Sequence, residues 1–283
     1  DVYKRQTWTG ARDFDAQVVT CALVFEFGAP EPASAGRGRW ARVVTERTGV
    51  PPVPSTMATS TSTLGDRGWL NANFRDEYYG LVGAVADRAD GPPLVTSGLI
   101  DPGRSLWGRR QVRFAKQRFA APRVDTGALD DRMLRWAERR LVPKVLVANQ
   151  TRVLEAVADI DGAWLPGVPV VSISPHGDRE TAAADTGRIA AVLTSASASA
   201  WAWHERGGTG LSATTIRVGP VMLAGLPWPA GPLDPAVDAL LAGDVVACGQ
   251  AVDEAYGAPA SERAALMSWW QPIVEGIIGR ATT

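Results

Sequence analysis

The sequence predicts an α+β fold, in which a mixed domain of short strands and helices is preceded by two strands and followed by a helical tail. Three observations support this class. The chain has 283 residues, of which 46% are hydrophobic and 21% charged, as in folded globular proteins. Apolar runs of strand length alternate with segments of helical periodicity, and the C-terminal part shows helical periodicity alone. No apolar run approaches the roughly 18 residues that a membrane span needs.

The first fifty residues predict two strands. Residues 15–27 and 38–47 are rich in β-branched and aliphatic side chains, and a loop rich in Pro, Gly and Ala joins them. The six opening residues have no periodicity, so we leave them out of the expected fold. Because two strands do not make a stable domain, we expect them to be the trailing edge of a larger sheet. Residues 48–63, rich in Pro, Ser and Thr, predict a linker.

The middle of the chain predicts alternating elements. Residues 70–88 have helical spacing, with Asn71 or Asn73 as the N-cap, and residues 92–100 form an expected strand. Residues 130–141 predict an amphipathic helix with arginines on one side and apolar residues on the other. Residues 143–159 contain two apolar runs around a polar centre, which is typical of a hairpin.

The last third predicts one more strand and several helices. Residues 165–174 favour a strand, and residues 189–204 a helix that ends at the glycine-rich residues 207–210. Residues 234–279 predict two helices separated at 257–259. We therefore expect four parts: residues 1–50, a linker at 51–63, a central domain at 64–230 and a helical tail at 231–283.

The charge is unevenly distributed along the chain. The net charge is −1, yet residues 104–152 contain 13 Lys and Arg against 4 Asp and Glu. A basic segment within an acidic whole is typical of a surface that binds a polyanion. A solvated basic face without any partner is the alternative.

Sites of other kinds are not indicated. Cys21 and Cys248 lie far apart, with no CxxC or Cys/His cluster, so we expect neither a disulfide framework nor a zinc site. This cysteine usage favours a reducing, cytoplasmic setting. No glycine-rich phosphate loop and no GxSxG motif is present, and both histidines, His176 and His204, are expected to be surface residues rather than catalytic ones.

Three blocks of sequence, residues 94–114, 140–169 and 189–229, occur in an order that is informative. The second block opens an apolar strand with Pro143-Lys144. The third block contains, in order, Val192-Leu193-Thr194-Ser195, Gly208-Thr209-Gly210, Ile216-Arg217 and Leu226-Pro227-Trp228-Pro229. Together the blocks resemble the C-terminal target-recognition region of adenine-specific DNA methyltransferases of the TaqI-like type. The resemblance covers roughly residues 15–230.

The resemblance implies a division of labour within a longer enzyme. Members of the family place their S-adenosylmethionine glycine motif and a catalytic [ND]-P-P-[YFW] motif upstream of this region, and the chain has neither. Residues 1–50 are then the edge of a methyltransferase domain, and the chain is expected to be an N-terminally truncated fragment. It would have no catalytic residues and no cofactor of its own, whereas the intact enzyme would use S-adenosylmethionine.

The expected function is therefore double-stranded DNA binding and target recognition, as the specificity part of a restriction-modification type of methyltransferase. The expected partners are duplex DNA and the missing methyltransferase domain, with no membrane. The fragment alone is predicted to be inactive. The alternative function is that of a stand-alone, non-catalytic nucleic-acid-binding module.

The candidate DNA-binding residues combine phosphate-binding cations with polar groups that read base edges. Three assignments have structural alternatives: an ordinary turn for the hairpin tip at 149–152, a helix C-cap for the glycine-rich loop, and a core anchor for Trp107. The predicted residues are Arg104, Trp107, Arg109, Arg110, Arg113, Lys116, Arg118, Lys144, Asn149, Gln150, Thr151, Arg152, Gly208, Thr209, Gly210 and Arg217.

Overall fold

A four-stranded antiparallel sheet organises the computed structural model, which describes residues 2–8, 21–27, 39–73, 75–88, 90–212 and 214–280. The strand order is β13-β11-β15-β3. The strands span Ala156–Asp159 (β13), Lys144–Ala148 (β11), Val170–Pro175 (β15) and Gly68–Ala72 (β3). The predicted mixture of helices and short strands is thus confirmed.

The two faces of this sheet contact different parts of the chain. Along β11, Val145 and Val147 join a core formed with the helices, whereas Leu146 and Ala148 join a second core on the other face. This alternation follows from the two-residue period of a strand. Both faces are buried, so β11 is apolar over nearly its whole length.

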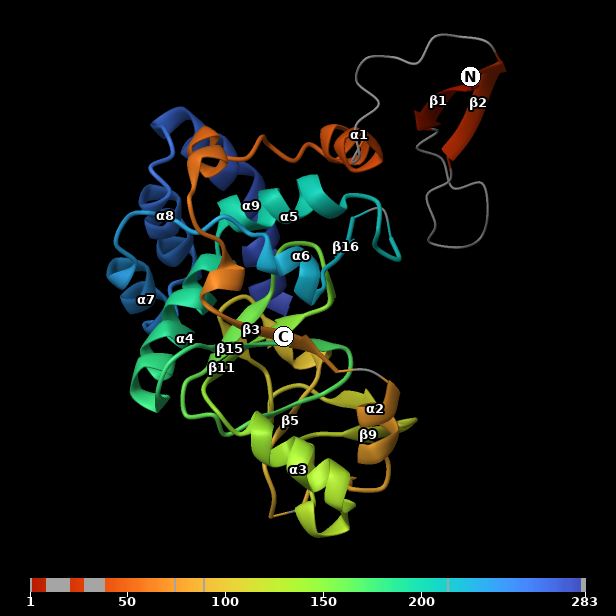
Figure 1. Cartoon of the computed structure of the whole chain (residues 1–283), viewed down its shortest axis with the longest axis vertical. Coiled ribbons are helices and arrows are strands. Elements are labelled where there is room, and N and C mark those ends of the chain that lie inside the picture. The colour runs from red at the N-terminus through yellow and green to blue at the C-terminus, as the bar shows by residue number, and fades with distance from the viewer. Residues whose placement is uncertain are drawn as a thin grey trace.

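The second core belongs to a part that we call the small lobe, residues 75–142. Figure 1 shows α2, β9 and α3 at one end of the molecule, away from α7 and α8. Short two-stranded ladders hold the lobe together, including β10 with β4 and β8 with β9. Its elements are α2 (Arg75–Leu81), β4 (Val85–Ala86), β5 (Leu94–Val95), β6 (Ile100–Asp101), β7 (Arg104–Ser105), β8 (Val112–Phe114), β9 (Gln117–Phe119), β10 (Arg123–Val124) and α3 (Asp131–Arg140).

Helices cover the opposite face of the sheet. α4 contacts β11, β13 and β15, and α5 packs against α8 and α9. The helices are α4 (Arg179–Leu193), α5 (Ala196–Arg206), α6 (Pro220–Ala224), α7 (Asp234–Leu241), α8 (Val245–Ala255) and α9 (Ala260–Arg280); the remaining strands are β12 (Gln150–Thr151), β14 (Leu165–Pro166) and β16 (Ile216–Arg217).

The N-terminal elements differ from the prediction. β2 (Cys21–Phe27) confirms part of the strand expected at 15–27, whose first six residues lie outside the described ranges. Its partner is β1 (Val2–Trp8), which includes most of the opening residues left out of the expected fold. The strand expected at 38–47 is wrong, because Arg39–Arg47 form helix α1. Ala41, Val44 and Thr45 are buried at helical spacing, and the Thr45 hydroxyl donates to the carbonyl of Ala41 at 2.8 Å.

Other boundaries also shift. The helix expected at 70–88 is wrong over its first residues, which form β3, and α2 supplies only its middle. The strand expected at 92–100 is broken by a 3₁₀ turn at Ser97–Leu99. The helix expected at 189–204 is two helices, because the Ser195 hydroxyl accepts from the backbone N–H of Ala198 and caps a new one. The tail contains three helices rather than two, since Gly243, with φ of +80°, ends α7.

The predicted amphipathic helix and hairpin are confirmed. Asp130 caps α3 by accepting from the N–H of Met133 at 2.7 Å, and β11 pairs antiparallel with β13. The expected linker packs against the C-terminal third: Ser55 bonds the carboxylate of Glu262, and Ser60 donates to the carbonyl of Trp228. Residues of the linker and of the tail belong to the same hydrophobic core as the sheet.

Candidate nucleic-acid interface

The β8–β9 hairpin carries an exposed cluster of cations. In its register Arg113 lies opposite Arg118, and both side chains are exposed. Val112, Phe114 and Phe119 point to the other side and are buried in the small lobe. Within the described ranges, neither arginine side chain has an ion pair or a hydrogen bond. Like charges directly opposite each other destabilise a ladder, so this pair favours a bound anion.

The turn of this hairpin has an unusual backbone. Ala115 and Lys116 have φ values of +46° and +67°, in the left-handed region. A two-residue hairpin turn with two positive φ values ordinarily uses Asn-Gly, because other residues are strained there by about 1–2 kcal/mol each. The strained turn places the exposed Lys116 at the tip, next to the arginine pair. Arg109, in the turn before β8, is also exposed and has no hydrogen-bond or ion-pair partner among the described residues. We call Arg109, Arg113, Lys116 and Arg118 the hairpin cluster.

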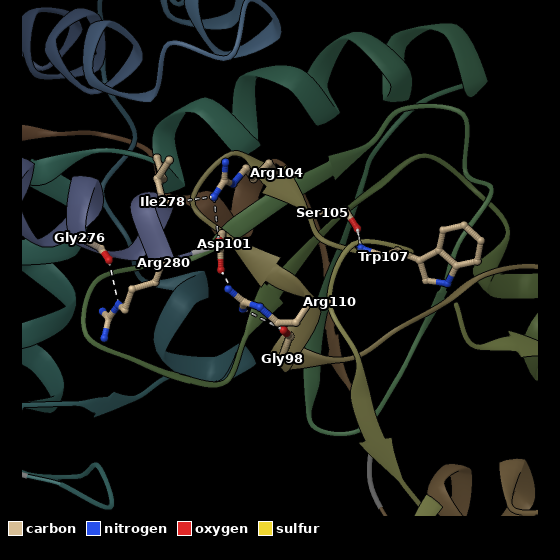
Figure 2. Close-up of polar contacts among 9 residues, drawn as sticks. All are labelled: Gly98, Asp101, Arg104, Ser105, Trp107, Arg110, Gly276, Ile278 and Arg280. Atoms are coloured by element: carbon tan, nitrogen blue, oxygen red, sulfur yellow. Dashed lines mark hydrogen bonds and ion pairs between the residues drawn. The ribbon is translucent and has the colours of Figure 1, made fainter. Parts of the chain in front are cut away.

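Two predicted cations have internal roles instead. Figure 2 shows Asp101 between Arg104 and Arg110, each with a nitrogen 3.3 Å from a carboxylate oxygen. Arg104 also donates to the carbonyl of Ile278 in α9 at 2.7 Å, and Arg110 to that of Gly98 at 3.2 Å. Asp101 is buried, so its two arginines are needed to balance its charge. Arg104 thereby ties the small lobe to the C-terminal helix.

Lys144 is a correction to the predicted set. Its side chain is fully buried and forms an ion pair with Asp159 across the β11–β13 hairpin. Its ammonium also donates to the carbonyl of Val142 at 3.2 Å. Burial lowers the pKa of Lys144, while Asp159 opposes that change. A side chain in this position cannot contact DNA.

The tip of the β11–β13 hairpin pairs with β16. Asn149 donates through its amide to the carbonyl of Val218 at 2.6 Å, and Thr151 is buried opposite Ile216. Neither side chain is available to read a base. Gln150 lies opposite Arg217, so the structure brings these two predicted residues together, and Arg152 is exposed beside them.

The glycine-rich loop is a helix C-cap. Gly207 ends α5, and Gly208 has φ of +80°. The Thr209 hydroxyl donates to the carbonyl of Arg206 and accepts from the N–H of Arg217, at 2.7 and 3.1 Å. Gly210 packs against the backbone of Thr215. The loop therefore lies next to β16, where it supports Arg217.

Trp107 anchors its loop to the core of the small lobe. Its indole N–H donates to the carbonyl of Pro122 at 2.8 Å, and the guanidinium of Arg123 lies 4.8 Å from its ring centre. The ring is half-buried against the small-lobe core. Both histidines also have structural contacts: His176 packs edge-on against Trp69, and His204 bonds the carbonyl of Pro51.

Glu155 is a residue that the sequence did not single out. Burial, with a smaller effect of Asp101, raises its pKa from 4.5 to about 8, although Arg110, Arg280 and Arg152 oppose the rise. The only sequence signal was a carboxylate directly after the expected hairpin tip. Glu155 thus holds a proton at neutral pH, beside a cluster of arginines.

Stability should depend on this proton. The pKa of Glu155 is higher in the folded state than in the unfolded state. The stabilising contribution of its neutral form is therefore fully present below about pH 4.5 and is lost as the pH rises toward about 8. Glu155→Gln keeps the neutral form at all pH values. We expect the melting temperature of the wild type to fall relative to that of Glu155→Gln between pH 5 and pH 9, as measured by calorimetry in about half-unit steps. Parallel curves for the two proteins would contradict this assignment.

A cavity of about 780 Å³ lies where residues 56–62 meet Trp228. The guanidinium of Arg67 stacks 5.1 Å above the Trp228 ring, and Arg188 pairs with Asp185 and Asp234. The two arginines and the two carboxylates balance in charge. This cavity therefore does not favour an anion.

No protein-family model matches the chain, and no curated protein matches it significantly. Among the described residues, no group of three or more His, Cys, Asp or Glu side chains could hold a metal ion. None of the described helices, including the 21-residue α9, is long and apolar enough to cross a bilayer. The functional assignment therefore depends on the hairpin cluster and on the order of the sequence blocks.

Proposed function

We propose that the chain binds double-stranded DNA through the hairpin cluster, as the target-recognition part of a site-specific adenine DNA methyltransferase. The observation that carries the proposal is the exposed pair of Arg113 and Arg118, directly opposite each other and without acceptors among the described residues. Phosphates would supply the missing acceptors. The strained turn at Lys116 adds a third cation at the tip, where a two-stranded ribbon can enter a major groove.

The second predicted group has a different role in this proposal. Gln150, Arg152 and Arg217 lie around the β12–β16 ladder. The amide can bind a base edge as donor and acceptor, and each guanidinium as a bidentate donor. The order of the three sequence blocks supports the narrower assignment to adenine-specific methyltransferases. The methyl donor of such an enzyme, S-adenosylmethionine, would bind at a glycine motif that this sequence does not contain.

The test compares two double variants of equal charge. Arg113→Ala/Arg118→Ala removes the opposed pair, and Arg47→Ala/Arg206→Ala removes two exposed cations that lie away from the small lobe. Each neutralised phosphate contributes about −0.9 to the slope of log affinity against log salt. We expect the first variant to reduce the slope for a duplex by roughly two units and the second to leave it unchanged, by fluorescence anisotropy across a salt series. Binding that is insensitive to salt, or equal losses in both variants, would overturn the proposal.

A further inference from the structure

A second cavity, of about 570 Å³, lies between the edge strand β3 and α3 of the small lobe. On the edge strand β3, Leu70 and Ala72 pack into the core under the helices, so Trp69 and Asn71 occupy the opposite face. The C-terminal end of α3 and the N-terminal end of α4 form the other walls. Its size is within the roughly 300–1,000 Å³ typical of small-molecule sites.

Two tryptophans line this cavity. Trp69 is 61% exposed, which is unusual for a side chain of its size, and the ring of His176 holds it edge-on at 4.2 Å between centres. Trp136, from α3, is only 6% exposed. Exposed aromatic faces on a rigid strand are suited to stacking against a planar group.

The polar lining has donors without acceptors. The indole N–H of Trp136 and the Nε–H of Arg140 are buried and have no hydrogen-bond partner in the described structure. Both donors belong to residues that line the cavity, but the two nitrogen atoms themselves are shielded from solvent.

The cavity is also positively charged. Arg139, Arg140 and Arg179 line it, against the single carboxylate of Asp178, which already caps α4 by accepting from the N–H of Thr181. Burial and neighbouring Arg139 both lower the pKa of Arg140, with Glu77 opposing them, so an anion here would relieve the guanidinium. Arg139 is exposed and is the last of the three arginines on the outer face of α3.

We propose that this cavity binds a nucleotide, with the base against Trp69 and the phosphate against Arg139 and Arg140. The exposed aromatic ring of Trp69 matches the base, and the net positive charge matches the phosphate. The nucleotide is either free or an unpaired nucleotide of a bound DNA strand. The inference goes beyond duplex binding by the hairpin cluster, because none of that cluster's residues lines the cavity.

The experiment titrates the full chain with deoxyadenosine 5′-monophosphate by calorimetry, with deoxyribose 5-phosphate and inorganic phosphate as partial ligands. We expect Trp69→Ala and Arg139→Ala each to weaken binding about fivefold or more. The first removes a stacking contact worth about 1–3 kcal/mol per base, and the second removes a cation from the phosphate. Tyr79→Ala, another exposed aromatic, and Arg135→Ala, one turn earlier on α3, are the matched controls and should bind as the wild type does. All four side chains are largely exposed, and unchanged melting temperatures would show that each variant folds.

Duplexes distinguish the two sources of the nucleotide. Preference for a duplex with a one-nucleotide bulge over a fully paired duplex, lost in Trp69→Ala, indicates a DNA-borne nucleotide; binding of the mononucleotide without that preference indicates a free one. Three results would overturn the proposal. The chain binds neither the mononucleotide nor the bulged duplex in preference to the paired one, the partial ligands bind as tightly as the nucleotide, or Trp69→Ala has no effect on binding. Arg113→Ala/Arg118→Ala should keep nucleotide binding. Failure of the duplex proposal can therefore be distinguished from failure of the nucleotide proposal.

Discussion

Replacing Lys144 by methionine is expected to lower the free energy of unfolding by about 3–5 kcal/mol, because it leaves a buried carboxylate without its cation. Lys144 is fully buried and pairs with Asp159, which is itself 2% exposed at its side chain. The Asp159 carboxylate also accepts from the N–H groups of Ala163 and Trp164, at 2.9 and 3.0 Å. These two bonds hold the carboxylate in place, so it cannot turn toward water when the lysine is removed.

A double-mutant cycle separates the ion pair from simple packing. Asp159→Asn alone leaves a buried ammonium and should also destabilise, whereas Lys144→Met/Asp159→Asn removes both charges and should recover a large part of the loss. Urea denaturation of the four proteins gives the coupling energy. Additive losses would show that the pair has no special role. Folded Lys144→Met should keep the salt dependence of DNA binding, because a buried side chain contacts no phosphate.

Three of the predicted cations have internal acidic partners for one reason. The count of 13 basic against 4 acidic residues begins at Arg104 and ends at Arg152. The buried Asp101 and Asp159 and the half-buried Glu155 lie just outside it. With these three included, the net charge of the segment falls from +9 to +6. Asp101 accepts from Arg104 and Arg110, and Asp159 pairs with Lys144. A sum of charge along the chain cannot show which cations the fold neutralises internally.

Local signals predicted α3 and the β11–β13 hairpin well. In α3 the periodicity and the Asp130 cap point to the same helix. For α1 the β-branched Val43, Val44 and Thr45 favoured a strand, but packing against α5 selected a helix. For β3 the opposite happened, since pairing with β15 overrode a helical pattern that begins at Leu70.

The exposed arginines of the β8–β9 hairpin could be predicted, because no acidic residue lies near them in the sequence to pair with them. The cavity beside Trp69 could not, since its walls come from β3, α3 and α4, which together span more than a hundred residues of the chain. Its residues become a group only when β3 adds to the edge of the sheet. The sequence predicted that the arginines of α3 share one face of the helix, but it did not predict the cavity at the C-terminal end of that helix.

Trp270→Ala is expected to cost about 3–5 kcal/mol of stability, because Trp270 is fully buried in the core that α9 shares with the sheet and with residues 44–64. The ring packs directly on α8: a Cβ built on Gly249 would lie 2.8 Å from it. Gly249→Ala should therefore destabilise the wild type, although alanine favours a helix by about 1 kcal/mol over glycine. In the Trp270→Ala background the same change should become neutral or stabilising.

Trp269→Ala, at a half-buried neighbour, is the matched control with a smaller loss. Thermal unfolding of the five proteins decides between a tail that is part of the core and one that folds separately, for which Trp270→Ala would leave the main transition unchanged.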